Sequence, residues 1–141
     1  MNHTLYEEAE PITMSGIMKK PVHIASPSAP LKEAISVMNE KKIGSIVVVA
    51  DELPVGIFTE RDLVKVVDNN IERIERPIGE SMNRQVVTLD LSENPTRGLI
   101  IMAEKRITHL PVVERGKVVG IVTQKDLVAW FMKRPAVLLG L

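Results

Sequence analysis

The sequence predicts an α/β (α+β) fold in which two similar β-α-β-β-α units pack about a pseudo-twofold axis. Three observations support this prediction: a long internal repeat, the same order of strand and helix patterns in both copies, and a hydrophobic content of 45% that can fill a core. Residues 18–66 align with residues 82–130 without a gap, and sixteen of the 49 aligned pairs are identical. A repeat present only twice favours two half-domains over a solenoid, because a solenoid needs three or more copies.

The first unit begins with a short extended segment over residues 22–24, followed by a helical pattern. Its apolar residues have the spacing of one helix face: Leu31, Ala34, Ile35 and Met38. Ser28 is the expected N-cap of this helix, since its hydroxyl can accept from a first-turn amide, and Pro30 suits that first turn. Two β-branched runs over residues 45–50 and 55–59 then predict a hairpin. A second helix is expected from Thr59 or Glu60 to about Asn69.

The second unit follows the same order. We expect an extended segment over residues 86–89, a helix over residues 94–105, a hairpin around Arg115-Gly116 and a helix over residues 123–133. Pro111 stands in the first strand of this hairpin. We therefore expect the start of that strand to lie at an edge or end of the sheet, where a missing N–H is tolerated.

The chain divides into five segments: a polar leader (1–12), a first unit (13–70), a charged linker (71–77), a second unit (78–134) and an apolar tail (135–141). A unit of about 50 residues buries its own sheet and helices poorly. We therefore expect the two sheets to pack against each other, which leaves two equivalent clefts between the units.

Composition excludes several classes of partner. Eighteen basic residues balance eighteen acidic ones, so the chain lacks the basic surplus that drives nucleic-acid binding. Without cysteine there is no disulfide, thiol catalysis or thiolate metal site. The acidic N-terminus lacks a secretion-signal pattern, and the apolar runs are too short to span a membrane. We therefore expect a cytoplasmic protein.

No pattern in the sequence indicates catalysis. The three histidines lack metal-ligand spacing, and neither a P-loop, a Gly-x-Gly-x-x-Gly turn nor a Gly-x-Ser-x-Gly elbow occurs.

Each unit ends its hairpin in the motif Gly-h-h-Thr-x-x-Asp, where h is apolar: residues 56–62 and 120–126. One interpretation is structural. Thr at the N-cap with Asp three residues later is close to a capping box, and an acid in the first turn suits the helix dipole. The glycines, Gly56 and Gly120, would then only allow close backbone approach at the end of a strand.

Two features favour a ligand site instead. Both copies keep Asp where Glu or Gln would cap at least as well, and a base precedes each Asp, Arg61 in one copy and Lys125 in the other. A carboxylate can accept from ribose hydroxyls, while the base, the Thr hydroxyl and free helix amides bind phosphate. Spacing alone leaves both interpretations open.

Two β-α-β-β-α units closing in this motif resemble a pair of cystathionine-β-synthase (CBS) domains, the Bateman module, over roughly residues 13–134. Three further segments carry the resemblance: Ile17-Met18, residues 41–45 and residues 105–113.

The resemblance implies that Asp62 and Asp126 each bind a ribose diol, and that adenine lies beside His23 or Val87. In one member that senses adenine nucleotides, a base just before the hairpin strand reaches the nucleotide of the other repeat. Arg106 matches this position for the Asp62 site and Lys42 for the Asp126 site. Arginine can bind phosphate bidentately, so we expect the Asp62 site to favour a ligand with more phosphate groups.

The full set of expected ligand contacts is Thr59, Arg61, Asp62, His23, Arg106, His109, Thr123, Lys125, Asp126, Val87, Lys42 and Ser45. For His109, a structural role is the alternative.

The helix expected over residues 94–105 also suggests an interface. Leu99 and Met102 match Ile35 and Met38 and should be core, whereas Ile100 replaces Ser36 and indicates either an extra interface or a larger core. The apolar tail could dock on its own domain or on a second subunit. CBS pairs commonly dimerise through these helices, so the resemblance implies a homodimer.

The resemblance thus implies a stand-alone, non-enzymatic sensor that binds AMP, ADP, ATP or a related adenosyl ligand, requires no cofactor and acts through a separate effector protein. The alternative is a structural or interaction module with empty clefts whose Thr/Asp pairs are only helix caps. A small nucleotide enzyme is a third possibility, disfavoured because no catalytic constellation is present.

Overall fold

The computed structural model describes residues 13–134 and residue 136 and contains two three-stranded sheets. The strands are β1 (Ile24–Ala25), β2 (Ser45–Ala50), β3 (Leu53–Thr59), β4 (Leu89–Asp90), β5 (His109–Glu114) and β6 (Lys117–Thr123). The α-helices are α2 (Leu31–Lys41), α3 (Glu60–Asn69), α4 (Pro95–Lys105) and α5 (Gln124–Met132). The described part of the chain also contains three short 3₁₀ helices: η1 (Met14–Gly16), η2 (Ile71–Glu75) and η3 (Ile78–Glu80).

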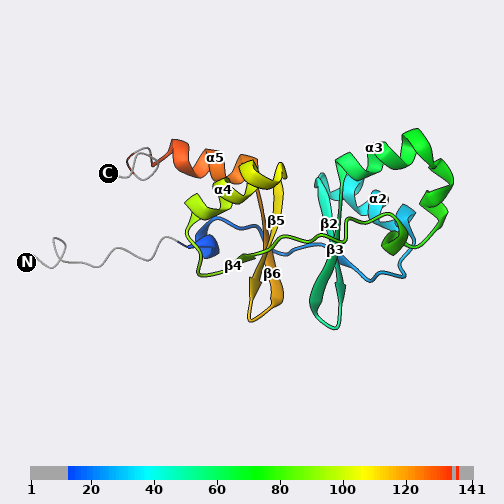
Figure 1. Ribbon diagram of the computed structural model, residues 1–141, viewed down its shortest axis with the longest axis horizontal. Coiled ribbons are helices and arrows are strands. Elements are labelled where there is room, and N and C mark those ends of the chain that lie inside the picture. The colour runs from blue at the N-terminus through cyan, green and yellow to red at the C-terminus, as the bar shows by residue number, and fades with distance from the viewer. Residues whose placement is uncertain (1–12, 135, 137–141) are drawn as a thin grey trace, which may run out of the picture.

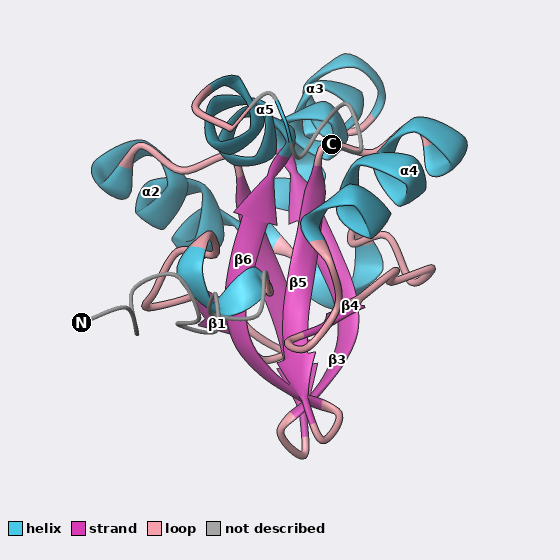
Figure 2. Ribbon diagram, turned by 90° about the vertical axis from the view of Figure 1, so that its left-hand side faces the viewer, coloured by secondary structure: helices cyan, strands magenta, loops and turns pink. Residues whose placement is uncertain are grey.

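The two sheets have the same topology, which confirms the predicted α/β fold. In each sheet the long hairpin is antiparallel, and the two-residue first strand adds parallel to it, giving the orders β1-β2-β3 and β4-β5-β6. Figure 1 shows the two units side by side with both hairpins pointing the same way. Figure 2 shows the α-helices gathered toward one end of the strands and the hairpin turns at the other.

The hairpin turns occur where the sequence predicts them. Asp51 and Glu52 in the first, and Arg115 and Gly116 in the second, all have positive φ angles, from 51° to 80°. Two consecutive positive φ angles give a turn whose twist matches that of the flanking strands.

Each unit contributes a segment to the other unit's sheet, which the sequence did not predict. Lys19 exchanges two backbone hydrogen bonds with Ile121 of β6 (2.8 and 3.2 Å), and Asn83 exchanges two with Ile57 of β3 (2.8 and 3.0 Å). In Figure 1 the first described residues, in blue, therefore lie against the second unit. The region between the units is thus built from both halves of the chain.

The hydrophobic cores follow the same exchange. One core forms around Leu31, Met38 and Phe58 and includes Met82; the other forms around Leu89, Met102 and Leu127 and includes Met14. Met38 and Met102 are buried, as expected, and Ile35 and Leu99 pack against the cores. Ile100 is 42% exposed, so it does not enlarge the core.

The expected N-cap of the first helix is wrong. Helix α2 begins at Leu31 with Pro30 as its N-cap, while Ser28 lies in the preceding turn with its hydroxyl 3.3 Å from that of Ser26. The amide of Leu31 donates to the carbonyl of Arg76 at 2.9 Å. The chain between the units thus satisfies an amide that a capping side chain would otherwise serve.

The expected position of Pro111 is confirmed: β5 is the central strand of its sheet, but its start lies at the end of the sheet, before the pairing with the two-residue strand β4 begins. In the first unit the equivalent residue, Val47, donates its N–H to the carbonyl of His23 at 3.1 Å, toward the short first strand. The ladder between β4 and β5 begins only at Val112. Pro111 therefore lacks a bond to the preceding segment and leaves the hairpin ladder intact.

Two further boundaries differ from expectation. The parallel strands begin at Ile24 and Leu89, later than the extended segments predicted from residues 22 and 86. The segment expected as a linker contains η2 and leads into η3, whose buried Ile78 joins the first core.

The leader (1–12) and nearly all of the apolar tail lie outside the described residues. No helix in the described part of the chain is long and apolar enough to cross a membrane.

Candidate functional site between the two units

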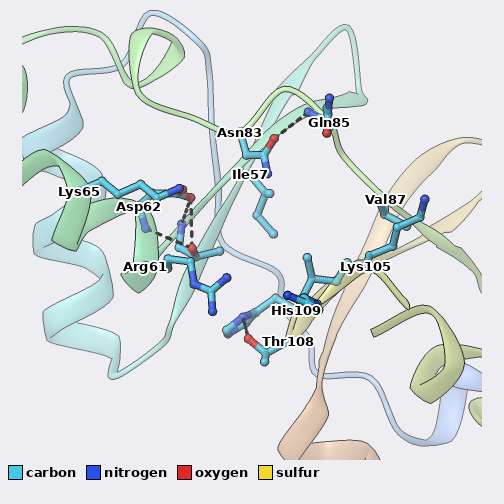
Figure 3. A pocket seen from close by; sticks show the side chains of 13 residues that line it. Ile57, Arg61, Asp62, Lys65, Asn83, Gln85, Val87, Lys105, Thr108 and His109 are labelled. Atoms are coloured by element: carbon cyan, nitrogen blue, oxygen red, sulfur yellow. Dashed lines mark hydrogen bonds between the residues drawn. The ribbon is translucent and has the colours of Figure 1, made fainter. Parts of the chain in front are cut away.

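A cavity of about 260 Å³ opens between the two units beside Asp62 (Figure 3). This volume is close to the lower end of small-molecule pockets, roughly 300–1,000 Å³. Its lining comes from both halves of the chain: Ile57, Thr59, Arg61, Asp62, Lys65, Asn83, Gln85, Val87, Lys105, Arg106, Ile107, Thr108 and His109. Six of these residues were predicted from the sequence as ligand contacts: Thr59, Arg61, Asp62, Val87, Arg106 and His109.

Asp62 caps helix α3 with only one of its two carboxylate oxygens. Oδ2 accepts from the Thr59 amide at 2.9 Å and from the Thr59 hydroxyl at 3.1 Å, while the amide of Asp62 donates to Thr59 Oγ1 at 3.4 Å. The capping interpretation is therefore correct in its geometry. However, Oδ1 accepts no hydrogen bond from the described residues. Capping and ligand binding are thus compatible at this residue.

The N-terminus of α3 offers fewer free amides than expected. The amide of Glu60 donates to the carbonyl of Gly44 at 3.2 Å, and that of Asp62 is used by the cap. Among the first three amides, this leaves Arg61. An anion in the cavity would depend mainly on side-chain cations.

The cavity is rich in such cations. Arg61, Lys65, Lys105 and Arg106 line it, and Asp62 is the single acidic residue in the lining. Arg106 is the C-cap of α4 and has a left-handed backbone (φ 55°). Two cations come from the helix that carries Asp62 and two from the end of the other unit's helix. Positive charge on both walls with one acceptor carboxylate suits a ligand that is both hydroxylated and anionic.

His109 lies between the two halves of the molecule. Its Nδ1 is 3.0 Å from the Thr108 hydroxyl, and its ring packs so closely on Gly44 that a Cβ there would clash with Nε2. Burial lowers the pKa of His109, and the carboxylates of Glu60 and Asp126 oppose this shift. Burial thus favours the neutral ring in the wall of the cavity, where Nδ1 faces Thr108 and Nε2 can donate or accept according to the tautomer.

The other six predicted residues belong to the pseudo-equivalent side, and none of them lines the cavity beside Asp62. Thr123, Lys125 and Asp126 form the start of α5, with the same capping box as α3. Lys42 is the C-cap of α2 with φ 55°, like its counterpart Arg106. Ser45 is the buried first residue of β2, and His23 precedes β1 and uses its carbonyl for Val47.

The clearest difference between the two sides is an ion pair. Lys19 Nζ lies 3.3 Å from Asp126 Oδ1, the oxygen that the cap leaves unused. Asn83 occupies the equivalent position on the Asp62 side, and its side-chain oxygen accepts from the Gln85 amide at 2.9 Å instead. The two sides are therefore related by fold but differ in chemistry.

Sequence reasoning missed several lining residues. Lys65 lies three positions after Asp62, and this helical spacing is the signal that could have identified it. Asn83 and Gln85 reach the cavity only because their segment adds to the other unit's sheet, and no sequence pattern indicated this exchange.

A second cavity of about 270 Å³ adjoins the first, and Asp62 and Lys65 line both. Arg73 and Glu80 also line it, as does Ser81, whose buried hydroxyl has no hydrogen-bond partner within the described structure. Asp62 and Lys65 of helix α3 thus form a wall common to the two cavities.

The fold and the site define a protein of two tandem β-α-β-β-α units with a small-molecule-sized cavity between them. The family model for the CBS domain matches the chain twice, over residues 14–69 and 76–133. The chain belongs to the CBS domain family.

Individual relatives agree with this assignment. A 17.7 kDa protein of Acidianus ambivalens is 34% identical over 116 residues, which are 81% of this chain and 70% of that protein. A protein of Methanopyrus kandleri is 34% identical over 119 residues, 82% of this chain but 61% of that protein. The crystal structure of the CBS domain pair of protein MJ0100, in complex with 5′-methylthioadenosine and S-adenosyl-L-methionine, superposes with a TM-score of 0.77 at 29% identity, covering 86% of this chain and 97% of that one.

Proposed function

We propose that this chain is a non-enzymatic regulatory module that binds an adenosyl ligand in the cavity beside Asp62. The observation that carries the proposal is that Oδ1 of Asp62 accepts no hydrogen bond from the described residues and lies in a cavity that has four cations in its walls. A ribose hydroxyl can donate to Oδ1 while Oδ2 stays in the helix cap. The similar domain pair that holds 5′-methylthioadenosine and S-adenosyl-L-methionine supports an adenosyl compound as the ligand class.

Within this class we propose a phosphorylated ligand: AMP, ADP or ATP. Arg61 and Arg106 approach from different units and can each bind a phosphate through two parallel N–H groups. Lys65 and Arg73 line the neighbouring cavity, where a longer polyphosphate would extend. Binding would then tie the two halves together, so a ligand could shift the module between arrangements for which it has different affinities. A separate effector protein would sense this shift.

Calorimetric titration of the chain with adenosine, AMP, ADP, ATP, NAD and S-adenosyl-L-methionine tests the proposal. We expect heat with at least one adenosine phosphate, and weaker binding of adenosine. Absence of heat and of a thermal shift with every compound would favour an interaction module in which Asp62 and Asp126 only cap helices. Turnover of a compound during incubation would show an enzyme instead.

We also propose that the module is a homodimer formed through its helical end. Six apolar side chains on or next to α3, α4 and α5 are 42–74% exposed: Val64, Val67, Ile71, Ile100, Val128 and Met132. Figure 2 shows the α-helices toward one end of the strands, so the exposed apolar residues on them can form the kind of patch that is typical of an interface. Sedimentation equilibrium should give twice the chain mass of 15.7 kDa, and Val64→Lys should shift the equilibrium toward monomer. A wild-type chain that sediments as a monomer at all concentrations would exclude the dimer.

A further inference from the structure

The Asp62 side, which lines the cavity, and the Asp126 side, called here the first and second clefts, differ at a pair of equivalent positions in the segments that the units exchange. Lys19 and Asn83 are equivalent in the repeat, and each exchanges two backbone hydrogen bonds with an equivalent isoleucine, Ile121 or Ile57. Because this pairing uses only main-chain atoms, it places no demand on either side chain. The structural role of the segment therefore does not explain why one copy carries a lysine and the other an asparagine.

The two side chains act differently on the acceptor carboxylates. On the second side, Asp126 Oδ2 accepts from the Thr123 amide at 3.1 Å, and Oδ1 lies 3.3 Å from Lys19 Nζ. Both carboxylate oxygens are therefore engaged within the chain. On the first side, Asn83 is held by the Gln85 amide, and Asp62 Oδ1 has no partner among the described residues.

We propose that Lys19 is an internal competitor for the acceptor carboxylate of the second cleft, so that the chain binds its adenosyl ligand preferentially beside Asp62. The inference rests on the proposed function. A ribose hydroxyl and the Lys19 ammonium group are both hydrogen-bond donors, and both are directed to the same oxygen of Asp126. A ribose hydroxyl has to share this oxygen with the ammonium group or displace it, and either weakens the hold on the ribose.

The exposure of the Lys19 and Asp126 side chains determines how strongly Lys19 weakens ligand binding in the second cleft. The Lys19 side chain is 71% exposed and that of Asp126 is 12% exposed. An ion pair with one solvated partner is weak, so Lys19 lowers the affinity of the second cleft by about fivefold rather than closing it. The competition acts in the free protein and needs no conformational change of the backbone.

Reciprocal exchange of the two side chains tests the proposal. Lys19→Asn gives the second cleft the residue of the first, and Asn83→Lys does the converse, while the backbone pairing of both segments is retained. The δ1 methyl groups of Ile57 and Ile121, labelled with ¹³C, report each cleft separately by NMR during titration with AMP. Lys20→Asn serves as the charge-matched control, because it removes the same charge one residue away.

In the wild type we expect Ile57 to titrate at lower AMP concentration than Ile121. Lys19→Asn should lower the dissociation constant measured at Ile121 by about fivefold and leave that at Ile57 unchanged, and Asn83→Lys should raise the constant at Ile57 by a similar factor. An unchanged or weaker response at Ile121 in Lys19→Asn, or the same gain in Lys20→Asn, would overturn the inference while leaving the proposed function intact. Absence of AMP-induced shifts in both methyls in all variants would overturn the inference for AMP and exclude AMP as the ligand, and the calorimetric titration with the other adenosyl compounds then decides the proposed function.

Discussion

The side chain of Met82 packs directly on the α-carbon of Gly56, in the middle of strand β3. A Cβ built on Gly56 would overlap both the sulfur and the γ-carbon of Met82, and the same relationship holds between Met18 and Gly120 in the other unit. The two glycines of the repeated motif therefore provide space for the segment that each unit inserts beside the other's sheet. Their conformational freedom is not required, since neither has a positive φ angle.

Gly56→Ala should destabilise the fold by about 1–3 kcal/mol, because the added methyl overpacks the contact with Met82. Thermal or urea unfolding measures this change. Gly16→Ala is the matched control, since a Cβ there meets no heavy atom within 4 Å. In the double variant Gly56→Ala, Met82→Ala, the loss should be smaller than the sum of the two single losses. Strict additivity would show that Met82 is not the group that Gly56 accommodates.

Much of this architecture could be predicted because the repeat provides two independent sequences for one backbone. Hairpin turns, helix ends and the two Thr/Asp caps depend on local patterns, and those patterns occur twice. The pairing of Arg106 with the Asp62 side came from the family resemblance, and the structure places that residue in the cavity wall.

The errors have a common physical origin in contacts between residues distant in the chain. Pro30 could replace Ser28 as N-cap because the carbonyl of Arg76 receives the first amide of α2. The ion pair of Lys19 with Asp126 spans more than a hundred positions and arises only because residue 19 pairs with the other unit's sheet. Hydrophobic periodicity carries no information about such pairings.

Replacement of Asp62 separates its two roles. Asp62→Ala removes the cap and the acceptor together, so it should lower the free energy of unfolding by about 1 kcal/mol and weaken adenosyl binding by about 1.5–3 kcal/mol. Asp62→Asn keeps an oxygen for the Thr59 amide but loses the charge. We expect near-normal stability for this variant with clearly weaker binding, measured by unfolding and calorimetry in parallel. Binding that survives in both variants would leave capping as the sole role of Asp62.

Arg106→Ala tests whether phosphate is held across the units. The wild type should prefer AMP to adenosine, and the variant should lose about 1.5–3 kcal/mol of that preference, since a hydrogen bond to a charged group is removed. Arg115→Ala is a close control, because Arg115 has nearly the same backbone conformation (φ 54° against 55°) but lies in a hairpin turn away from the cavity. Calorimetry with both ligands gives the preference directly. An unchanged preference in Arg106→Ala would remove this residue from the phosphate site.

His109 should make the stability of the protein depend on pH. Burial lowers its pKa below the ordinary value of 6.5, against the opposing carboxylates of Glu60 and Asp126. As pH falls below 6.5, the unfolded chain therefore takes up this proton before the folded chain does. The folded state then loses stability, and the full contribution is present only above 6.5.

His109→Gln keeps hydrogen-bonding groups at this position and removes the titration, so it isolates the effect from the other ionisable groups. We expect the free energy of unfolding to fall less in the variant than in the wild type between about pH 7.5 and about pH 5.5. Urea unfolding at several pH values in this range gives the slope of the unfolding free energy against pH for the wild type and for the variant. Parallel slopes would show that the folded and unfolded states bind the His109 proton equally, and hence that the carboxylates of Glu60 and Asp126 offset the desolvation of the ring. A steeper slope in the variant would reverse the sign of the shift and make His109 a protonated group beside Glu60 and Asp126.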